Sequence, residues 1–506
     1  MKIPEYVKNI IEKLEQAGFE AYIVGGCVRD LLSEREPKDW DVTTNAKPEE
    51  ILAVFPEGKY ENAFGTVLVP AEQKTKLDKI MVEVTTYRSE QDYSDRRRPD
   101  QVIFEDELDK DLERRDFTVN AMAIEINSKS EILNSKQIQN SKFKIQNWRI
   151  IDLFGGQKDL KKKIIRAVGE PTDRFKEDAL RMMRAIRLAS ELNFEIEPKT
   201  SRAVTKMAGG IKFIANERIK DELIKILQSD KPYGGIMLLH ETKLLQYILP
   251  ELERGVGVEQ NRHHIHTVFV HSVLSLKNCP SKDWRVRFAA LLHDIAKPQT
   301  KKFIGEDPTT GSGQVATFYN HDIVGAKVAG KIMRRLKFSN EDVEKTTTYI
   351  RNHMFYYNVG EVTESSVRRL VRKVGEENLK DLIDLRIADR LGSGVPKAKP
   401  YKLRHLEYMM EKTRHDAVSV KMLKINGDDL IKNLKIEPGP KIGAILDVLL
   451  SEAIEDSGLN NKKYLEKRSE ELNKMDLAEL REKAKGKIEE KKMEDDMELK
   501  KEFWVK

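Results

Sequence analysis

Three acidic residues near the start of the chain have the types and the spacing of a magnesium site. Asp39 and Asp41 are separated by Trp40, so in a strand both carboxylates would share one face while Trp40 points into the core. Glu83 is the single acid in the apolar run 80–84, where a charge needs a partner. Carboxylates on one face repel each other unless a cation lies between them, and Mg²⁺ prefers oxygen ligands. Ordinary surface ion pairs are the alternative, and for Asp39 and Asp41 alone both interpretations stay open.

A glycine pair supplies a second chemical feature. Gly25 and Gly26 follow the apolar run 21–24 and precede a helix expected to begin near Val28. Glycines at such a turn let backbone amides approach a phosphate at a helix N-terminus, and Arg29 adds a cation one turn later. An ordinary strand-to-helix turn has the same pattern, so the pair alone is a weak signal of phosphate binding.

Strand and helix patterns alternate where these residues lie. Apolar and alternating runs predict strands at 21–24, 66–69 and 80–86, with helices before and between them. From about residue 169 the pattern is almost wholly helical. The sequence therefore favours an α+β protein, in which a region of mixed strands and helices is followed by helices.

The motifs in this order resemble the head of the DNA-polymerase-beta-like nucleotidyltransferases. More narrowly, the chain is similar to the class II CCA-adding tRNA nucleotidyltransferases and their poly(A) polymerase relatives. Besides residues 25–30 and 39–41, the matching segments are 64–67, 83–88, 114–122, 174–181 and 216–218. The resemblance implies template-independent addition of CCA to the 3′ end of tRNA from CTP and ATP. A poly(A) polymerase of the same superfamily is the nearest alternative.

The resemblance also implies roles for individual residues. Two Mg²⁺ ions would be held by Asp39 and Asp41, with Glu83 as the third catalytic carboxylate, to activate the RNA 3′-hydroxyl and stabilise pyrophosphate. Residues 25, 26 and 29 would hold the triphosphate, and residues 114–116 would meet the sugar and the phosphates, with Asp116 and Asn120 placed to hydrogen-bond hydroxyls. The implied nucleotide-binding set is Gly25, Gly26, Arg29, Arg114, Arg115, Asp116, Asn120, Asp178, Arg181, Arg184 and Arg187.

Base choice has a physical explanation on the predicted helix that carries Asp178 and Arg181. Residues three apart share one helix face, and a carboxylate only accepts hydrogen bonds while a guanidinium only donates them. Cytosine and adenine each present an amino donor beside a ring-nitrogen acceptor, whereas uracil and guanine present the reverse, so one Asp–Arg pair would select C and A. An intrahelical ion pair of Arg181 with Glu177 or Asp178 is the alternative. Arg184 and Arg187 continue the same helix face, which we call the base-reading stripe. They would contact RNA or the triphosphate, or they would form a solvated surface.

A second set of residues resembles the metal site of HD phosphohydrolases. His271, the doublet His293-Asp294 and Asp389 match the signature, and His321 and His353 would complete a two-metal version. Mixed imidazole and carboxylate ligands suit a divalent transition metal such as Mn, Fe, Ni, Co or Zn better than Mg²⁺. The resemblance implies phosphodiesterase or phosphatase activity as an addition. A phosphohydrolase whose head only docks RNA is therefore a further alternative.

Two segments differ from their surroundings. Residues 93–100 resemble the flexible loop of enzymes that add the complete CCA end, which favours full CCA synthesis over CC-only addition. Residues 127–147 repeat Asn-Ser-Lys three times and are interpreted as a surface insertion without chemistry. The expected domains are a head at 1–160, a helical neck for base selection and RNA binding at 161–235, an HD domain at 236–400, and a helical tail with tRNA contacts and a charged end at 401–506.

Composition limits the classes of protein that remain. The chain has 506 residues, and 90 basic residues exceed 84 acidic ones by six, a surplus that permits RNA binding without arguing for it. No apolar run reaches the roughly 18–20 residues that span a bilayer, so no membrane partner is expected. With only two cysteines, Cys27 and Cys279, a disulfide framework is not indicated and a cytoplasmic location is expected. The expected partners are tRNA, CTP and ATP, and the pattern says nothing of oligomeric state.

Overall fold

The computed structural model describes residues 3–62, 65–71, 80–91, 101–126, 148–260, 265–306, 314–414 and 423–505. The predicted loop 93–100 and the predicted insertion 127–147 lie outside these residues. Contacts group the chain into two units, 1–277 with 282–347, and 278–281 with 348–506. The four domains expected from the sequence are a finer division, which stays a prediction.

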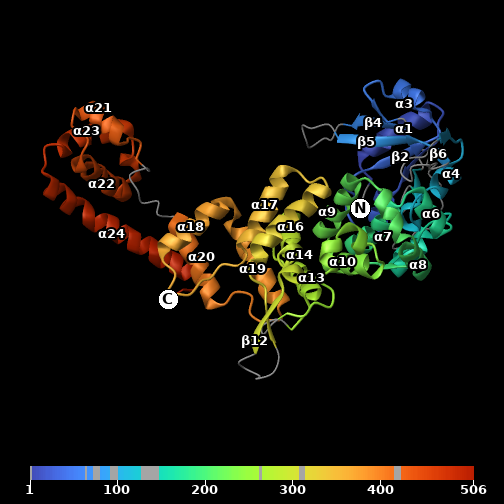
Figure 1. Cartoon of the computed structure of the whole chain (residues 1–506). Coiled ribbons are helices and arrows are strands. Elements are labelled where there is room, and N and C mark those ends of the chain that lie inside the picture. The colour runs from blue at the N-terminus through green and yellow to red at the C-terminus, as the bar shows by residue number, and fades with distance from the viewer. Residues whose placement is uncertain are drawn as a thin grey trace, which may run out of the picture. The chain divides into compact units, whose positions relative to one another are not determined.

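A seven-stranded mixed sheet forms the centre of the head (Figure 1), in the order β3-β4-β5-β2-β1-β8-β9. Strands β2 and β5 run parallel, and the other neighbours in the sheet are antiparallel. The three strands predicted from the sequence are confirmed as β1, β4 and β5. The sheet consists of β1 (Ala21–Val24), β2 (Asp41–Thr44), β3 (Lys59–Asn62), β4 (Thr66–Ala71), β5 (Ile80–Thr86), β8 (Ala123–Ile126) and β9 (Trp148–Ile151).

Alternation along the strands gives the sheet two different faces. On one face Ile23, Val42 and Val84 join a buried core with helices α1 (Glu5–Gln16) and α3 (Pro48–Val54). On the other face Val24 packs with Leu108 and Leu112 of helix α4 (Leu108–Glu113). Residue parity places the side chains of β2 and β5 that are not in the first core on this second face, which is where the acids lie.

Helices make up most of the rest of the first unit. They are α2 (Gly26–Leu32), α5 (Gly156–Lys162), α6 (Pro171–Glu177), α7 (Leu180–Leu192), α8 (Pro198–Met207), α9 (Asn216–Gln228), α10 (Pro232–Glu241), α11 (Leu245–Ile248), α12 (Pro250–Glu253), α13 (Val268–Lys277), α14 (Trp284–Leu292), α15 (Lys297–Thr300) and α16 (His321–Arg335). Three small strand pairs accompany them, β6 (Arg88–Gln91) with β7 (Gln101–Phe104), β10 (Ile164–Ile165) with β11 (Glu195–Ile196), and β12 (Lys302–Glu306) with β13 (Gln314–Thr317). Strand β11 and the hairpin β12–β13 are the exceptions among the described residues to the almost wholly helical pattern predicted beyond residue 169.

The second unit is helical in the residues that the structure describes. Helix α17 (Asn340–Asn352) runs into it from the first unit. One buried cluster joins α18 (Glu364–Val374), α19 (Leu379–Gly392) and α20 (Tyr401–Arg414). Another joins α21 (Gly427–Leu434), α22 (Pro440–Glu455), α23 (Lys462–Leu472) and the first turn of α24 (Leu477–Glu502). The α+β fold expected from the sequence is thereby confirmed.

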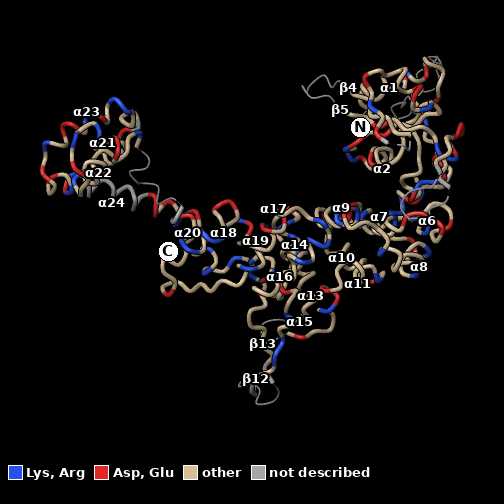
Figure 2. Tube along the Cα trace, turned by 45° about the horizontal axis from the view of Figure 1, so that its top comes forward, with Lys and Arg blue, Asp and Glu red and all other residues tan. Residues whose placement is uncertain are grey.

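Charge and apolar length bear on possible partners. Figure 2 shows Lys and Arg interleaved with Asp and Glu along both units, in keeping with the small basic surplus of the sequence. Among the described residues, the helices lack a stretch with the length and apolar character needed to cross a membrane.

Candidate nucleotide site and histidine cluster

Two of the predicted acids face each other across neighbouring strands. The parallel register of β2 and β5 pairs Asp41 with Glu83, and paired residues point to the same face of a sheet. The prediction that Asp39 also lies in the strand was wrong, because β2 begins at Asp41, where its partner β1 ends at Val24. Asp39 lies two residues before the strand, and the buried side chain of Trp40 between them confirms the inward direction expected for it.

The charge of this acidic group is poorly compensated by the protein. Burial raises the pKa of Asp41, Arg115 lowers it and Asp39 raises it, with a net shift upward. Burial also raises the pKa of Glu83, and Asp41 is the next cause of that rise. Carboxyl groups whose ionised forms are disfavoured in this way gain from a bound cation, so the donor set fits Mg²⁺.

The absence of a side chain at Gly25 allows the backbone to approach Asp41 and Arg115 closely. The φ of Gly25, 83°, is in the left-handed region that glycine adopts without strain. A Cβ at this position would lie 3.1 Å from Nη1 of Arg115 and 3.2 Å from Oδ2 of Asp41. Helix α2 then begins at Gly26, two residues earlier than expected. Gly25 therefore lies directly against Asp41 and Arg115, and Gly26 lies against the guanidinium of Arg29.

A chain of hydrogen bonds connects α2 with α7. Arg29 donates from Nη1 to Oδ1 of Asn120 (2.7 Å) and from Nε to Oδ1 of Asp30 (2.8 Å). Asn120 donates to Oδ1 of Asp116 (3.2 Å), whose Oδ2 accepts from Nε of Arg184 (2.7 Å). Burial would raise the pKa of Asp116, but Arg184 and its other partners lower it to about 2. Four residues of the predicted set thus form one charged network.

Asp111 is a residue of this region that the sequence interpretation missed. Its carboxylate is fully buried and accepts from Nε (2.9 Å) and Nη2 (2.6 Å) of Arg114 and from Nη2 of Arg115 (3.0 Å). Burial would raise the pKa of Asp111, and the two guanidinium groups lower it to about 2. Its spacing was the available signal, since it stands three and four residues before the arginines on a helical segment.

The chain breaks where a continuous helix was predicted to carry Asp178 and Arg181. Helix α6 ends at Glu177, Asp178 is extended with φ −138° and ψ 107°, and α7 begins at Leu180. Oδ1 of Asp178 accepts the backbone N–H of Leu180 (2.9 Å), which is how an aspartate competes with helix continuation. The prediction that the two share one helix was therefore wrong.

Ion pairs engage the four residues of the predicted base-reading stripe. Oδ2 of Asp178 accepts from Nη2 of Arg218 (2.6 Å), and Arg181 donates from Nη1 to Oε2 of Glu177 (2.5 Å). The pair of Arg181 with Glu177 is the alternative that the sequence left open. Arg187 is held by Glu222 (2.7 Å) and Glu191 (2.8 Å), and Arg184 by Asp116, as described above. Two of the three arginines reach the head: Arg184 pairs with the side chain of Asp116, and Arg181 donates to the backbone carbonyl of Arg114.

Four predicted metal ligands meet in the first unit. Nε2 of His271 lies 3.0 Å from Nε2 of His293, and both atoms lie 3.2 Å from Oδ2 of Asp294. Nε2 of His321 lies 3.4 Å from Oδ1 of Asp294. The sequence grouped these residues as one metal site, and the fold places them close together from α13, the end of α14 and the start of α16.

The ring orientations indicate a cation. His293 donates from Nδ1 to the carbonyl of Ala290 (2.9 Å), and His321 does so to Phe318 (2.7 Å), because a carbonyl can only accept. In a neutral ring the opposite atom, Nε2, then carries a lone pair. Lone pairs directed at the carboxylate of Asp294 are repulsive unless a metal ion or protons lie between them.

Lys297 is a neighbour of this histidine cluster that the sequence interpretation did not single out. Its ammonium group lies 2.7 Å from Oδ2 of Asp294 and donates to Oε1 of Gln260 (2.6 Å). Burial would raise the pKa of Asp294, but His293 and Lys297 hold it well below its usual range. Lys297 therefore supplies positive charge to the acid of this cluster, and His293 adds to it when its ring is protonated.

Two further predicted ligands belong to the second unit. His353 is buried and donates from Nδ1 to the carbonyl of Ile350 (2.6 Å), the same ring arrangement as in the cluster. Asp389 is buried on α19 and accepts from Arg386 (2.7 Å). Their role as ligands stays a prediction.

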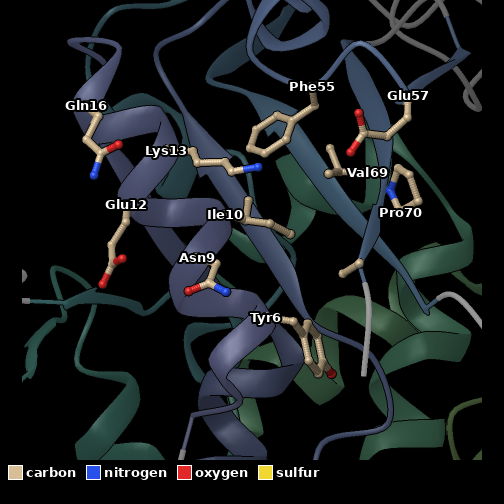
Figure 3. Close-up of a pocket in the computed structure, with 11 residues that line it drawn as sticks. Tyr6, Asn9, Ile10, Glu12, Lys13, Gln16, Phe55, Glu57, Val69 and Pro70 are labelled. Carbon is tan, nitrogen blue, oxygen red and sulfur yellow. The ribbon is translucent and has the colours of Figure 1, made fainter. Parts of the chain in front are cut away.

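A hollow in the head lies away from these groups. It has a volume of about 470 Å³ and is formed by α1, the segment after α3 and the end of β4 (Figure 3), with Lys13 over the ring of Phe55. Val69, which lines it, belongs to the α1 face of the sheet, whereas the acids lie on the α4 face. The candidate nucleotide site is thus a feature of the opposite face.

Comparisons with known proteins match three parts of the chain. Residues 21–166 match the profile of the Poly A polymerase head domain, and residues 193–255 that of the probable RNA and SrmB-binding site of polymerase A. Residues 315–468 match the profile of the putative tRNA nucleotidyltransferase domain 2.

Curated relatives extend the likeness over most of the chain. A CCA-adding enzyme of Levilactobacillus brevis is 41% identical over 263 residues, which are 52% of this chain and 60% of that protein. An A-adding tRNA nucleotidyltransferase of Deinococcus radiodurans is 33% identical over 356 residues, 68% of this chain and 74% of the relative. A CCA-adding enzyme of Limosilactobacillus reuteri is 30% identical over 472 residues, 93% of this chain and 97% of the relative.

Solved structures share the fold. The crystal structure of the Bacillus stearothermophilus CCA-adding enzyme in complex with CTP superposes with a TM-score of 0.57 at 26% identity, covering 94% of this chain and 98% of that one. A tRNA nucleotidyltransferase complexed with a primer tRNA and an incoming ATP analog gives 0.52 at 19% identity, covering 81% and 99%. The second likeness concerns the fold alone.

Proposed function

Because the chain belongs to the CCA-adding enzymes, tRNA nucleotidyltransferases with a poly(A)-polymerase-type head, we propose that it adds CCA to the 3′ end of tRNA from CTP and ATP. The observation that carries the proposal is the register of β2 and β5, which pairs Asp41 with Glu83 beside Gly25 and Arg115. Enzymes of this family depend on divalent metal ions. The relative from Bacillus stearothermophilus was solved with CTP, which supports the choice of substrate.

Asp39 and Asp41 would hold two Mg²⁺ ions, with Glu83 as the third carboxylate. Bound there, the ions would lower the pKa of the RNA 3′-hydroxyl and neutralise the pyrophosphate as it leaves. Gly25 would let the backbone approach the triphosphate, since a Cβ there would crowd Asp41 and Arg115. Arg29 and Arg115 would neutralise the phosphates, and residues 114–116 would meet the sugar.

Base selection would use Asp178 and Arg181 at the junction of α6 and α7. Both side chains are engaged in ion pairs, with Arg218 and Glu177, so an incoming base must displace these partners or share them. Cytosine and adenine can do so with an amino donor toward Asp178 and a ring-nitrogen acceptor toward Arg181. Uracil and guanine would leave buried donors and acceptors unmatched.

The deciding experiment is an assay on tRNA lacking its CCA end, read at single-nucleotide resolution with CTP alone, ATP alone, or both. We expect two additions with CTP alone and three with both nucleotides. Long adenosine tails with ATP alone and no incorporation of CTP would identify a poly(A) polymerase instead. Addition only to tRNA already ending in CC would identify an A-adding enzyme, the activity of the relative from Deinococcus radiodurans.

The histidine cluster supports a second, phosphohydrolase function. The Nε2 atoms of His271, His293 and His321 surround one carboxylate and would hold a divalent transition metal, with His353 and Asp389 as further predicted ligands. A bound metal would polarise a phosphodiester and activate water. If the protein loaded with Mn, Fe, Ni, Co or Zn fails to hydrolyse a 2′,3′-cyclic phosphodiester, the cluster has a structural or regulatory role.

A further inference from the structure

Asp111 is the most deeply buried acid beside the nucleotide site. Its exposed fraction is 0%, and its two oxygens divide their partners, Oδ1 taking Arg114 and Oδ2 taking Arg115. Oδ2 also lies 3.4 Å from Oγ1 of Thr43, which stands two residues after Asp41 on the same strand face. One carboxylate thus connects α4, β2 and both arginines.

Arg115 stands between two acids as a result. Its Nη2 is bound by Asp111, and its Nη1 reaches toward Gly25, where Oδ2 of Asp41 is also close. Without a competing carboxylate, the guanidinium would be free to pair fully with Asp41 and occupy the place of a metal ion.

We propose that Asp111 is a positioning residue for nucleotide and metal binding, which fixes Arg115 so that it faces the triphosphate and leaves Asp41 open to Mg²⁺. The inference rests on the proposed function, because it assigns Arg115 to the triphosphate. A long side chain fixed at folding loses less conformational freedom when the ligand binds. Arg114 gains in the same way, and its backbone carbonyl accepts from Nη2 of Arg181 (3.2 Å), which extends the fixed region to α7.

A second buried aspartate in the head provides a matched control. Asp159 is 3% exposed, and it accepts from Nε of Arg166 (3.0 Å) and Oγ1 of Thr118 (2.8 Å). It resembles Asp111 in burial and in its partners, an arginine and a threonine. Its arginine belongs to none of the predicted nucleotide-binding residues, so its loss should affect stability and leave nucleotide binding alone.

The test compares Asp111→Asn with Asp159→Asn in the full chain, on tRNA lacking its CCA end. We expect Asp111→Asn to raise the KM for CTP and ATP about tenfold, the effect of one lost charge-assisted hydrogen bond. The Mg²⁺ concentration for half-maximal rate should rise severalfold, while kcat changes by less than about threefold. Asp159→Asn should keep both quantities within about twofold of the unmodified protein, whatever its melting temperature.

A double substitution distinguishes an effect through Arg115 from a general weakening of the head. In an Arg115→Ala background, Asp111→Asn should raise the KM by a clearly smaller factor than in the unmodified protein, because only Arg114 is left for it to position. If Asp111→Asn does not fold, Arg115→Lys replaces it in the test. A lysine keeps the positive charge but cannot contact Asp111 and the triphosphate at the same time, so a raised KM for CTP and ATP in this variant supports the proposal.

Three results would overturn the inference. They are an unchanged KM and Mg²⁺ requirement in Asp111→Asn, equal changes in Asp159→Asn, and an unchanged KM in Arg115→Lys. An unmodified protein that transfers neither C nor A to tRNA refutes the proposed function itself, a result separate from these three.

Discussion

The acids of the head and the histidine cluster are two candidate metal sites that the same chain builds in opposite ways. In the head, burial and a neighbouring acid raise the pKa of Asp41, and Arg115 compensates only in part. In the histidine cluster, His293 and Lys297 lower the pKa of Asp294 despite its burial. The acids of the head keep an excess of negative charge until ligands bind, whereas Asp294 has the ammonium group of Lys297 beside it.

The contrast teaches what each site is suited to do. A site that is short of positive charge gains most when metal ions and substrate arrive together, which suits exchangeable Mg²⁺ and a nucleotide that enters and leaves. Imidazoles that are oriented by backbone carbonyls, as in His293 and His321, are prepared for one long-lived ion. The comparison therefore predicts two independent metal requirements.

The largest expected effect separates the two sites completely. Asp41→Ala removes a ligand of the magnesium pair, so nucleotide addition should fall at least about 1,000-fold. The transition-metal content of the protein should stay the same. Single-nucleotide assays and elemental analysis measure the two, with the exposed Asp109→Ala on α4 as a control. Turnover retained in Asp41→Ala would overturn the assignment of the site.

The converse change affects the other site. His293→Ala should weaken binding of the transition metal by about 100-fold, because one ligand and its fixed orientation are lost. CCA addition should persist within about twofold. Metal content after dialysis is the readout, and His240→Ala, whose ring pairs with Glu253 (2.8 Å), is the control outside the cluster. Loss of both activities together would show that the two sites are coupled.

Base choice should change without any change in metal binding. Arg181→Ala removes the donor that matches the ring nitrogen of C and A, so the preference for CTP over UTP should fall about tenfold while some transfer persists. Lys176→Ala, which breaks an exposed pair with Asp173 on α6, should leave the preference intact. Continued exclusion of UTP and GTP by Arg181→Ala would refute base reading by the protein.

The smallest effect concerns stability without metal. A carboxyl group with a raised pKa in the folded state stabilises the protein below its usual pKa near 4, and this contribution is lost as pH rises through the folded-state value. At pH 7 without Mg²⁺, Asp41→Asn should therefore raise the melting temperature by roughly 1–3 °C. Asp294→Asn should lower the melting temperature, because His293 and Lys297 stabilise the ionised form of Asp294 in the folded protein. A fall in both variants would remove the electrostatic contrast.

Local patterns were sufficient to predict the elements that carry the acids. Alternation along the chain predicted β1, β4 and β5 and the inward direction of Trp40. It could not give the pairing of Asp41 with Glu83, because β2 and β5 are not consecutive and their register depends on the whole sheet. The need of the lone acid Glu83 for a partner connected those two residues, and the family resemblance supported the connection.

Side-chain competition explains the parts that local patterns missed. Asp178 interrupts the predicted helix because its carboxylate accepts the N–H of Leu180, an interaction that helical spacing does not reveal. Asp111 has the sequence environment of a surface helix, and only the packing of α4 on the sheet shows that it is buried. Lys297 likewise becomes a neighbour of Asp294 only through the fold.

The hydrogen-bonded chain of Arg29, Asn120, Asp116 and Arg184 has a consequence for engineering. It connects α2, which would bind the phosphates, to α7, which would contact the base. Cytosine and adenine differ by a whole ring, so a shift of α7 that accommodates the larger base would also move the grip on the phosphates. Attempts to redesign which nucleotide is accepted would then alter how firmly any nucleotide is held, and the two properties would have to be optimised together.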